Sequence, residues 1–183
     1  MTANTLFPGR PNYEGPAEGI FGLLHHEVLW EPSHNVHERV EYVKAEKPPN
    51  EVAIRLHNMI YLGGCPTAIA ASALEAEHWL ELDALNEDRL AKLDAPNKDY
   101  WAKRDALKDD YWDWAKLKPL NDDYRTKMRL LNGDYGAKVQ ALNEDYWAKM
   151  KLLNAEIEAY IKSHIPDCAW DGKTLVFPIM QPL

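Results

Sequence analysis

Residues 85 to 163 consist of seven consecutive units built on the pattern Leu-Asn-x-Asp-Tyr. The units LNGDYGAKVQA (131–141) and LNEDYWAKMKL (142–152) are typical, and one longer unit, at 107–119, has thirteen residues instead of eleven. Eleven residues make three turns of about 3.67 residues each, so equivalent positions stay on one face of a helix. The repeat therefore predicts helix along this part of the chain.

Apolar residues in the second half of the repeat recur at steps of four, four and three, which is the pattern of one buried face of an amphipathic helix. The positions of this structural stripe are Leu120, Tyr124, Met128, Leu131, Tyr135, Val139, Leu142, Tyr146, Met150, Leu153, Ile157 and Ile161. Upstream, the same positions include Arg89, Pro96 and Arg104. We therefore expect the first part of the repeat to form a less regular helix.

The thirteen-residue unit predicts a reversal of the chain. Its two extra residues rotate the stripe by about 200°, so a single straight helix would present its two halves on opposite faces. Pro119 suits the first turn of a new helix and is disfavoured inside one. We predict an antiparallel hairpin with its turn near Lys118 and Pro119. Pro96 leaves an alternative open, in which the first arm is kinked or divided and the helices form a three-helix arrangement.

The predicted fold class is mainly α, with a long antiparallel helical hairpin of hendecad repeats on a small α+β base. Residues 65–163 form the helical repeat arm in this interpretation. Residues 1–64 and 164–183 form the small mixed base. The two ends of the arm return to this base because the helices that precede and follow the turn have similar lengths.

Local patterns within the base predict one helix and two strands. The segment 33–49 reads as a helix with Ser33 or Asn35 as its N-cap, because valines follow at helical spacing and prolines end it. The segment 51–62 favours a strand because its apolar residues alternate, although helical spacing also fits. The segment 173–177 favours a strand after an Asp-Gly turn.

Charge and hydropathy exclude some classes of partner. The 183 residues include 21 Lys and Arg against 29 Asp and Glu, which gives a net charge of −8. A negative chain repels phosphate backbones, so we do not expect nucleic acid as a partner. No apolar run reaches the roughly 18 to 20 residues that a membrane span needs, and the N-terminal segment lacks a secretory signal pattern. A cytoplasmic location is the expectation.

Tryptophans beside the structural stripe are the candidate partner-binding residues, namely Trp101, Trp112, Trp114 and Trp147. They either widen the buried face or form an exposed aromatic surface, and exposed Trp and Tyr are typical anchors of protein interfaces. Self-association is a further expectation, because two slender helices cover only part of a stripe rich in Tyr, Leu and Met.

Two cysteines and two histidines near the ends of the arm are candidate metal ligands. Cys65 precedes the arm, His164 and Cys168 follow it, and His57 lies upstream. A closed hairpin would bring the thiols together, and mixed Cys and His ligands suit tetrahedral zinc. Free thiols and a disulfide are the competing interpretations. No set of catalytic residues is recognised, because neither a nucleophile with a base nor a phosphate-binding loop is present.

Three features together carry a family resemblance. They are ERVEYVKAEKPPNEVAIRL (38–56), the run of eleven-residue units with Asp-Tyr and DAP, and the closing CAWDGKTLVFP (168–178). The chain resembles a group of bacterial and phage proteins of unknown function that combine a small base with variable numbers of helical units. The resemblance implies no active-site residues. It makes host-directed binding, including inhibition of a host defence system, a candidate role in the host cytoplasm.

The leading functional hypothesis is a noncatalytic protein that uses a helical hairpin for protein–protein interaction or assembly. The alternative is a zinc-stapled module or a metal-dependent enzyme centred on the His- and Cys-containing base. An acidic mimic of nucleic acid ranks last, because lysines alternate with the carboxylates along the repeat.

Overall fold

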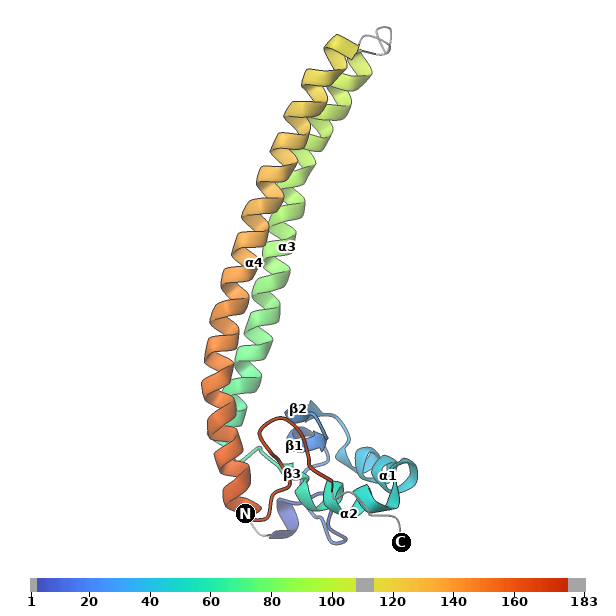
Figure 1. The fold of residues 1–183 in the computed structure, drawn as a ribbon, viewed down its shortest axis with the longest axis vertical. Coiled ribbons are helices and arrows are strands. Elements are labelled where there is room, and N and C mark those ends of the chain that lie inside the picture. Colours follow the sequence, from blue (N-terminus) through green and yellow to red (C-terminus); the bar gives the residue numbers. More distant parts are fainter. Residues whose placement is uncertain (1–2, 108–113, 178–183) are drawn as a thin grey trace. The chain divides into compact units, whose positions relative to one another are not determined.

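The computed structural model describes residues 3–107 and 114–177, and the chain divides into two compact units. Unit 1 comprises residues 1–75 and 148–183, and unit 2 comprises residues 76–147. The chain is mainly helical. Its longest elements are α3 (Pro66–Ala106) and α4 (Trp114–His164), each of which contributes residues to both units (Figure 1).

Unit 1 contains a three-stranded antiparallel sheet with the order β2-β1-β3. Strand β1 (Gly19–His25) is central and pairs with β2 (Val28–Ser33) along a tight hairpin and with the short β3 (Ile60–Tyr61). The register shifts between Gly22 and His25, where Leu23 adopts a positive φ of 59°. A bulge of this kind re-aims the strand and accounts for the left-handed backbone at a buried leucine.

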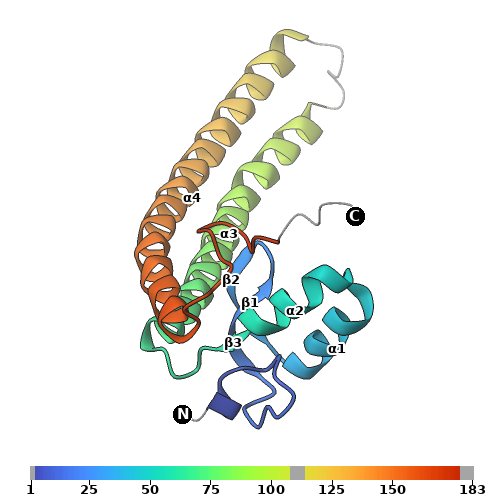
Figure 2. The same ribbon diagram turned by 60° about the horizontal axis from the view of Figure 1, so that its bottom comes forward.

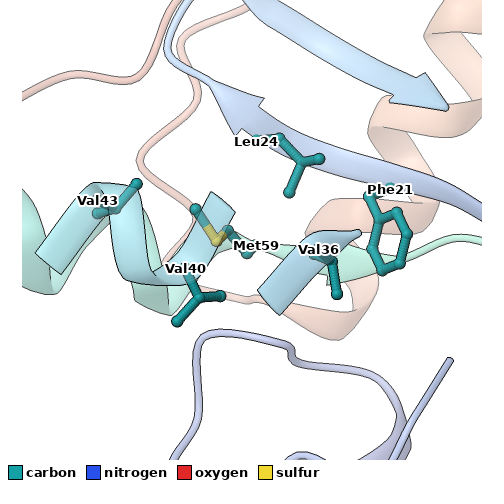
Figure 3. Close-up of a cluster of buried hydrophobic side chains, with 6 residues drawn as sticks. All are labelled: Phe21, Leu24, Val36, Val40, Val43 and Met59. Carbon is teal, nitrogen blue, oxygen red and sulfur yellow. The ribbon is translucent and has the colours of Figure 1, made fainter. Parts of the chain in front are cut away.

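Two short helices follow the hairpin, α1 (Val36–Glu46) and α2 (Pro49–Asn58). The side chain of Asn35 accepts hydrogen bonds from two backbone N–H groups of the first turn of α1, which confirms Asn35 as the N-cap. One face of α1 packs with β1 and with the residue that ends α2 to form the core shown in Figure 3. The members of that core are Phe21, Leu24, Val36, Val40, Val43 and Met59.

Two strand predictions for the base are wrong. The segment 51–62 is mostly helical, because α2 starts at Pro49 and only Ile60–Tyr61 is strand. Pro48 and Pro49 fix backbone angles that suit a helix start, and the helical spacing of the apolar residues prevails over their alternation. The segment 173–177 contributes only an isolated bridge between Trp170 and Leu175, with no strand among its described residues.

Within unit 1, the start of α3 and the end of α4 are tied together and to β2. The hydroxyl of Thr67 on α3 donates to Glu156 on α4 over 3.0 Å, and the indole N–H of Trp30 on β2 donates to Asn154 over 2.8 Å. Ile157 and Ile161 on α4 are fully buried. Apolar burial and these two side-chain bonds therefore hold both helix ends in unit 1.

In unit 2, α3 and α4 lie side by side with antiparallel contacts (Figures 1 and 2). Tyr100 contacts Asn121, and earlier on α3 His78 contacts Tyr146, which lies later on α4. The twelve positions of the structural stripe on α4 are all buried or half-buried. The inward face therefore coincides with the apolar stripe that the sequence carries.

The predicted turn at Lys118 and Pro119 is wrong, because α4 already begins at Trp114 and runs through both residues. Among the described residues, α3 ends at Ala106 and α4 begins at Trp114, so Lys118 and Pro119 lie inside a helix. Pro119 is the sixth residue of α4, just beyond the four positions whose backbone N–H groups have no partner within the helix, so it removes one hydrogen bond from the second turn. Helix α3 also continues through Pro96, so the first arm is not divided there.

Candidate functional site

The fifth position of the repeat forms a ladder of three stacked layers of planar groups between α3 and α4 in the described part of unit 2. The rings of His78 and Tyr146 lie 4.1 Å apart, and those of Tyr100 and Tyr124 lie 4.3 Å apart. Between these layers, the guanidinium carbon of Arg89 lies 4.7 Å from the centre of the Tyr135 ring. Each step to the next layer is eleven residues on both helices. The repeat length therefore sets the spacing of the layers.

The asparagine at the second position of the repeat secures the tyrosines of the opposite helix. The hydroxyl of Tyr100 donates to Asn121 Oδ1, and that of Tyr124 donates to Asn97 Oδ1, both over 2.7 Å. The two bonds are reciprocal, because each helix supplies one Asn and one Tyr. In this layer, the Asn and Tyr of the Leu-Asn-x-Asp-Tyr pattern are thus joined by one cross-helix contact made twice.

One face beside the ladder carries charged pairs of opposite sign. The aspartate at position four bonds the lysine one turn later on the same helix, as Asp88 bonds Lys92 and Asp134 bonds Lys138. These four residues also line one shallow hollow between the helices, so the pairs of α3 and α4 lie on the same face. The hydrogen bond from Lys138 lowers the pKa of Asp134. The charges balance locally, which makes this face neutral.

The opposite face of unit 2 carries the sixth position of the repeat. Position four precedes the ladder residue and position six follows it, so they point to opposite sides of the helix pair. Because the helices are antiparallel and both are right-handed, equivalent positions of α3 and α4 lie on the same side. We call this side the aromatic face, and its large apolar residues are Trp79, Leu90, Trp101 and Trp147.

The large side chains of the aromatic face are strongly exposed. Trp79 is 59% exposed, Trp101 is 55% and Trp147 is 64%, while Leu90 between them is 54% exposed. Trp79 and Trp147 flank the first ladder layer, with their rings 6.0 Å from His78 and 5.0 Å from Tyr146. The rings of Trp79, His78, Tyr146 and Trp147 therefore form a continuous row, and the two tryptophans at its ends are exposed to solvent.

The predicted partner-binding tryptophans divide into three groups. Trp101 and Trp147 lie on the aromatic face. Trp114 is 68% exposed and lines a hollow of about 600 Å³ with Tyr124, Arg125 and other residues near the start of α4. Trp112 lies outside the described residues. The widened-core interpretation therefore does not apply to the three tryptophans that the structure describes.

Trp79 was missed by reasoning from the repeat that starts at residue 85. The signal is present one unit earlier, because LEAEHWLELDA (74–84) places His78 at position five and Trp79 at position six. This unit lacks the Leu-Asn-x-Asp-Tyr letters and keeps only the apolar and aromatic spacing. Extending the hendecad frame upstream would have identified it.

The candidate zinc ligands are not brought together. His57 pairs with Asp167 over 3.0 Å, and His164 Nδ1 lies 2.9 Å from the carbonyl oxygen of Tyr160. Cys65 is buried and Cys168 is half-buried, and both are free thiols. Among residues 3–107 and 114–177, no group of three or more His, Cys, Asp or Glu side chains is arranged to hold a metal ion.

A polar cluster at the β1 bulge was also missed. Arg39 on α1 donates to the carbonyl oxygen of Leu24 and to Nδ1 of His25, the latter over 2.8 Å. Because an arginine only donates, His25 Nδ1 accepts and its proton sits on Nε2, which lies 3.2 Å from Glu31 Oε1. Both ring nitrogens are thus directed at protein groups. The cluster holds the bulge and leaves no imidazole nitrogen for a substrate.

The cluster is partly shielded from water. Burial, followed by the nearby Arg39 guanidinium, lowers the pKa of His25 below its usual 6.5. Burial also raises the pKa of Glu31, and Arg39 opposes that change. The Oε1 atom of Glu31 has no well-aligned hydrogen bond in the described part of the chain, although His25 is close to it.

Comparison with known proteins leaves the fold and the site to be interpreted from the chain itself: no family model, no curated protein and no solved structure matches it. Within the described ranges, no helix is both long enough and apolar enough to cross a membrane.

Proposed function

We propose that this chain is a noncatalytic protein that acts in protein–protein interaction or assembly through a hairpin of α3 and α4. The aromatic face of unit 2 is the binding surface in this proposal. Host-directed inhibition by a bacterial or phage protein is the biological role that fits the sequence resemblance. The single observation that carries the proposal is the row of large apolar residues at position six, each more than half exposed.

The row is not needed for pairing of the two helices. The ladder, the Tyr–Asn bonds and the structural stripe already occupy the inward positions, so an outward tryptophan adds little to the stability of unit 2. Exposed tryptophan is unfavourable in water, and it recurs here at the same repeat position. Tryptophan is also the residue type most enriched at interface hot spots. Binding of a protein partner explains its placement.

The face suits a protein better than a small molecule or nucleic acid. It lies on two regular helices rather than in a concave cavity, and small-molecule sites are concave. The opposite face of unit 2 is neutral because its aspartates and lysines are paired, so it offers no basic stripe to phosphates. Rigid helix faces with aromatic anchors are a recurring surface for protein recognition.

Affinity capture from the native host tests the proposal. The full-length chain and the double variant Trp79→Ser/Trp147→Ser would be compared by quantitative mass spectrometry. Leu130→Ser is the matched control, because Leu130 is 65% exposed but lies outside position six. We expect a partner that the wild type and the control retain and the double variant loses. Partners retained equally by all three proteins would contradict the proposal.

A further inference from the structure

We propose that the aromatic face binds a second copy of this chain, with α3 of one copy lying over α4 of the other in a parallel four-helix dimer. This inference rests on the proposed function and names its partner. Three properties of the face support it: complementary shape, complementary charge and sufficient apolar area.

The aromatic face carries large projecting side chains and one gap, at a glycine. Leu90 at position six of α3 shares its layer with Gly136 at position six of α4, because they follow the paired residues Arg89 and Tyr135. A Cβ atom added at Gly136 would meet nothing within 4 Å. Glycine inside a helix destabilises it by about 1 kcal/mol relative to alanine, and Gly136 leaves a gap in the aromatic face. A leucine of a second copy fits over this gap.

The edges of the face carry opposite charges at position ten of the repeat. The α3 edge carries Asp83, Asp94 and Asp105 at this position. The α4 edge carries Arg129 and the neutral Gln140, and Lys118, eleven residues before Arg129, is bonded to Asp122 on its own helix. Asp94 lies between the Arg89 and Tyr100 layers, and Arg129 lies between the same two layers on the other helix.

Two symmetric face-to-face arrangements are available, and the charges distinguish them. A two-fold axis parallel to the helices places α3 over the partner's α4, so Asp94 meets Arg129 and Leu90 meets Gly136. An axis across the helices places α3 over α3, so the acidic edges face each other. Opposite charges favour an interface and like charges oppose it. The parallel arrangement follows, although Asp94 also bonds Lys98 on its own helix.

The apolar area is adequate for a stable dimer. A tryptophan side chain exposed to this degree offers roughly 100 Å² to a partner. The four large side chains of the aromatic face then contribute about 800 Å² in total from two copies, and specific interfaces bury about 1,200–2,000 Å². The residues between them, including the charged edges, supply the remainder. The first-layer ring row would then continue across the interface through Trp79 and Trp147.

Sedimentation equilibrium of the purified full-length chain tests the inference. We expect a dimer whose dissociation constant rises by about 30-fold or more in Trp101→Ser, since interface tryptophans are common hot spots. Leu130→Ser should leave the constant unchanged. A monomer at all concentrations up to about 0.5 mM, or equal effects of the two substitutions, would overturn the inference.

A charge swap tests the arrangement. Asp94→Arg and Arg129→Asp should each weaken the dimer, and the double variant should restore it to within about threefold of the wild type. An Asp94→Arg variant that dimerises more tightly would overturn the parallel arrangement. The proposed function and self-association can be distinguished. A monomeric chain that still captures another protein through Trp79 and Trp147 would support the proposed function and refute self-association.

Discussion

The reciprocal Tyr–Asn bonds of the ladder make a quantitative prediction about unit 2. Replacing both Tyr100 and Tyr124 by phenylalanine keeps the stacked rings but removes two hydroxyl donors. A part-buried hydrogen bond contributes about 1 kcal/mol, so the double variant should lose about 2 kcal/mol. That free energy corresponds to roughly a 30-fold larger population of the locally open state.

Hydrogen–deuterium exchange read by mass spectrometry measures this opening in the full-length chain. Amides of α3 and α4 near the Tyr100 layer should exchange roughly 30-fold faster in the double variant. Amides of the β1 strand belong to unit 1 and should be unaffected. The local readout avoids a single melting temperature, which is not well defined when two units unfold separately.

Tyr135→Phe is the matched control. Tyr135 occupies the same repeat position, and within the described residues it contacts Arg89 through its ring, with no bond from its hydroxyl. Its exchange pattern should match the wild type. Equal exchange in the wild type and the Tyr100→Phe/Tyr124→Phe variant would refute the assignment of these Asn and Tyr residues to cross-helix bonding.

Three further outcomes are expected. Gly133→Ala should stabilise unit 2 by about 0.5–1 kcal/mol in urea unfolding, because a Cβ there meets nothing within 4 Å, and a loss of stability would contradict open space. Since burial lowers the pKa of His25 below 6.5, the contribution of His25 to folding stability should be fully present above that pH and decline as the pH falls below it. Urea unfolding at about pH 7.5 and 6.0 measures this difference. The raised pKa of Glu31 has the opposite effect, because it lowers folding stability as the pH rises through and above its usual 4.5. His25→Gln should remove the decline in stability at low pH, and an unchanged pH profile of stability in this variant would contradict the cluster geometry. Elemental analysis should find no stoichiometric zinc, since His57 and His164 are directed at Asp167 and Tyr160, and one zinc per chain that chelators release with loss of fold would contradict this.

The helices were predictable because their signal is periodic and local. Steps of four, four and three locate the inward face of α4 without knowledge of its partner, and those positions are buried or half-buried in the structure. The ladder was not predictable in the same way. Which residue faces Tyr135 depends on the register between two helices, and the letters of one helix do not specify it.

The errors have specific physical causes. The turn was placed at Pro119 because proline is disfavoured inside helices, but α4 includes Pro119 as its sixth residue. The strand predicted for 51–62 relied on alternation, and the proline at the start of α2 outweighed it. Trp79 was overlooked because its unit keeps the spacing of the repeat but not its letters.

Interhelical distances within unit 2 test the central claim most directly, namely that the eleven-residue repeat pairs α3 with α4 layer by layer. One sample would carry spin labels at residues 91 and 137, and a second sample would carry them at 102 and 126. Each label lies two positions after a ladder residue, in the Arg89–Tyr135 layer for the first sample and in the Tyr100–Tyr124 layer for the second. In a Cys65→Ser/Cys168→Ser background, pulsed electron resonance should give the same short distance for both pairs. The mixed pair 102 and 137 should be longer, because the offset between its labels exceeds that of the same-layer pairs by eleven residues, or about 16 Å along the helix. Two same-layer pairs with clearly different distances, or a mixed pair as short as they are, would contradict the account.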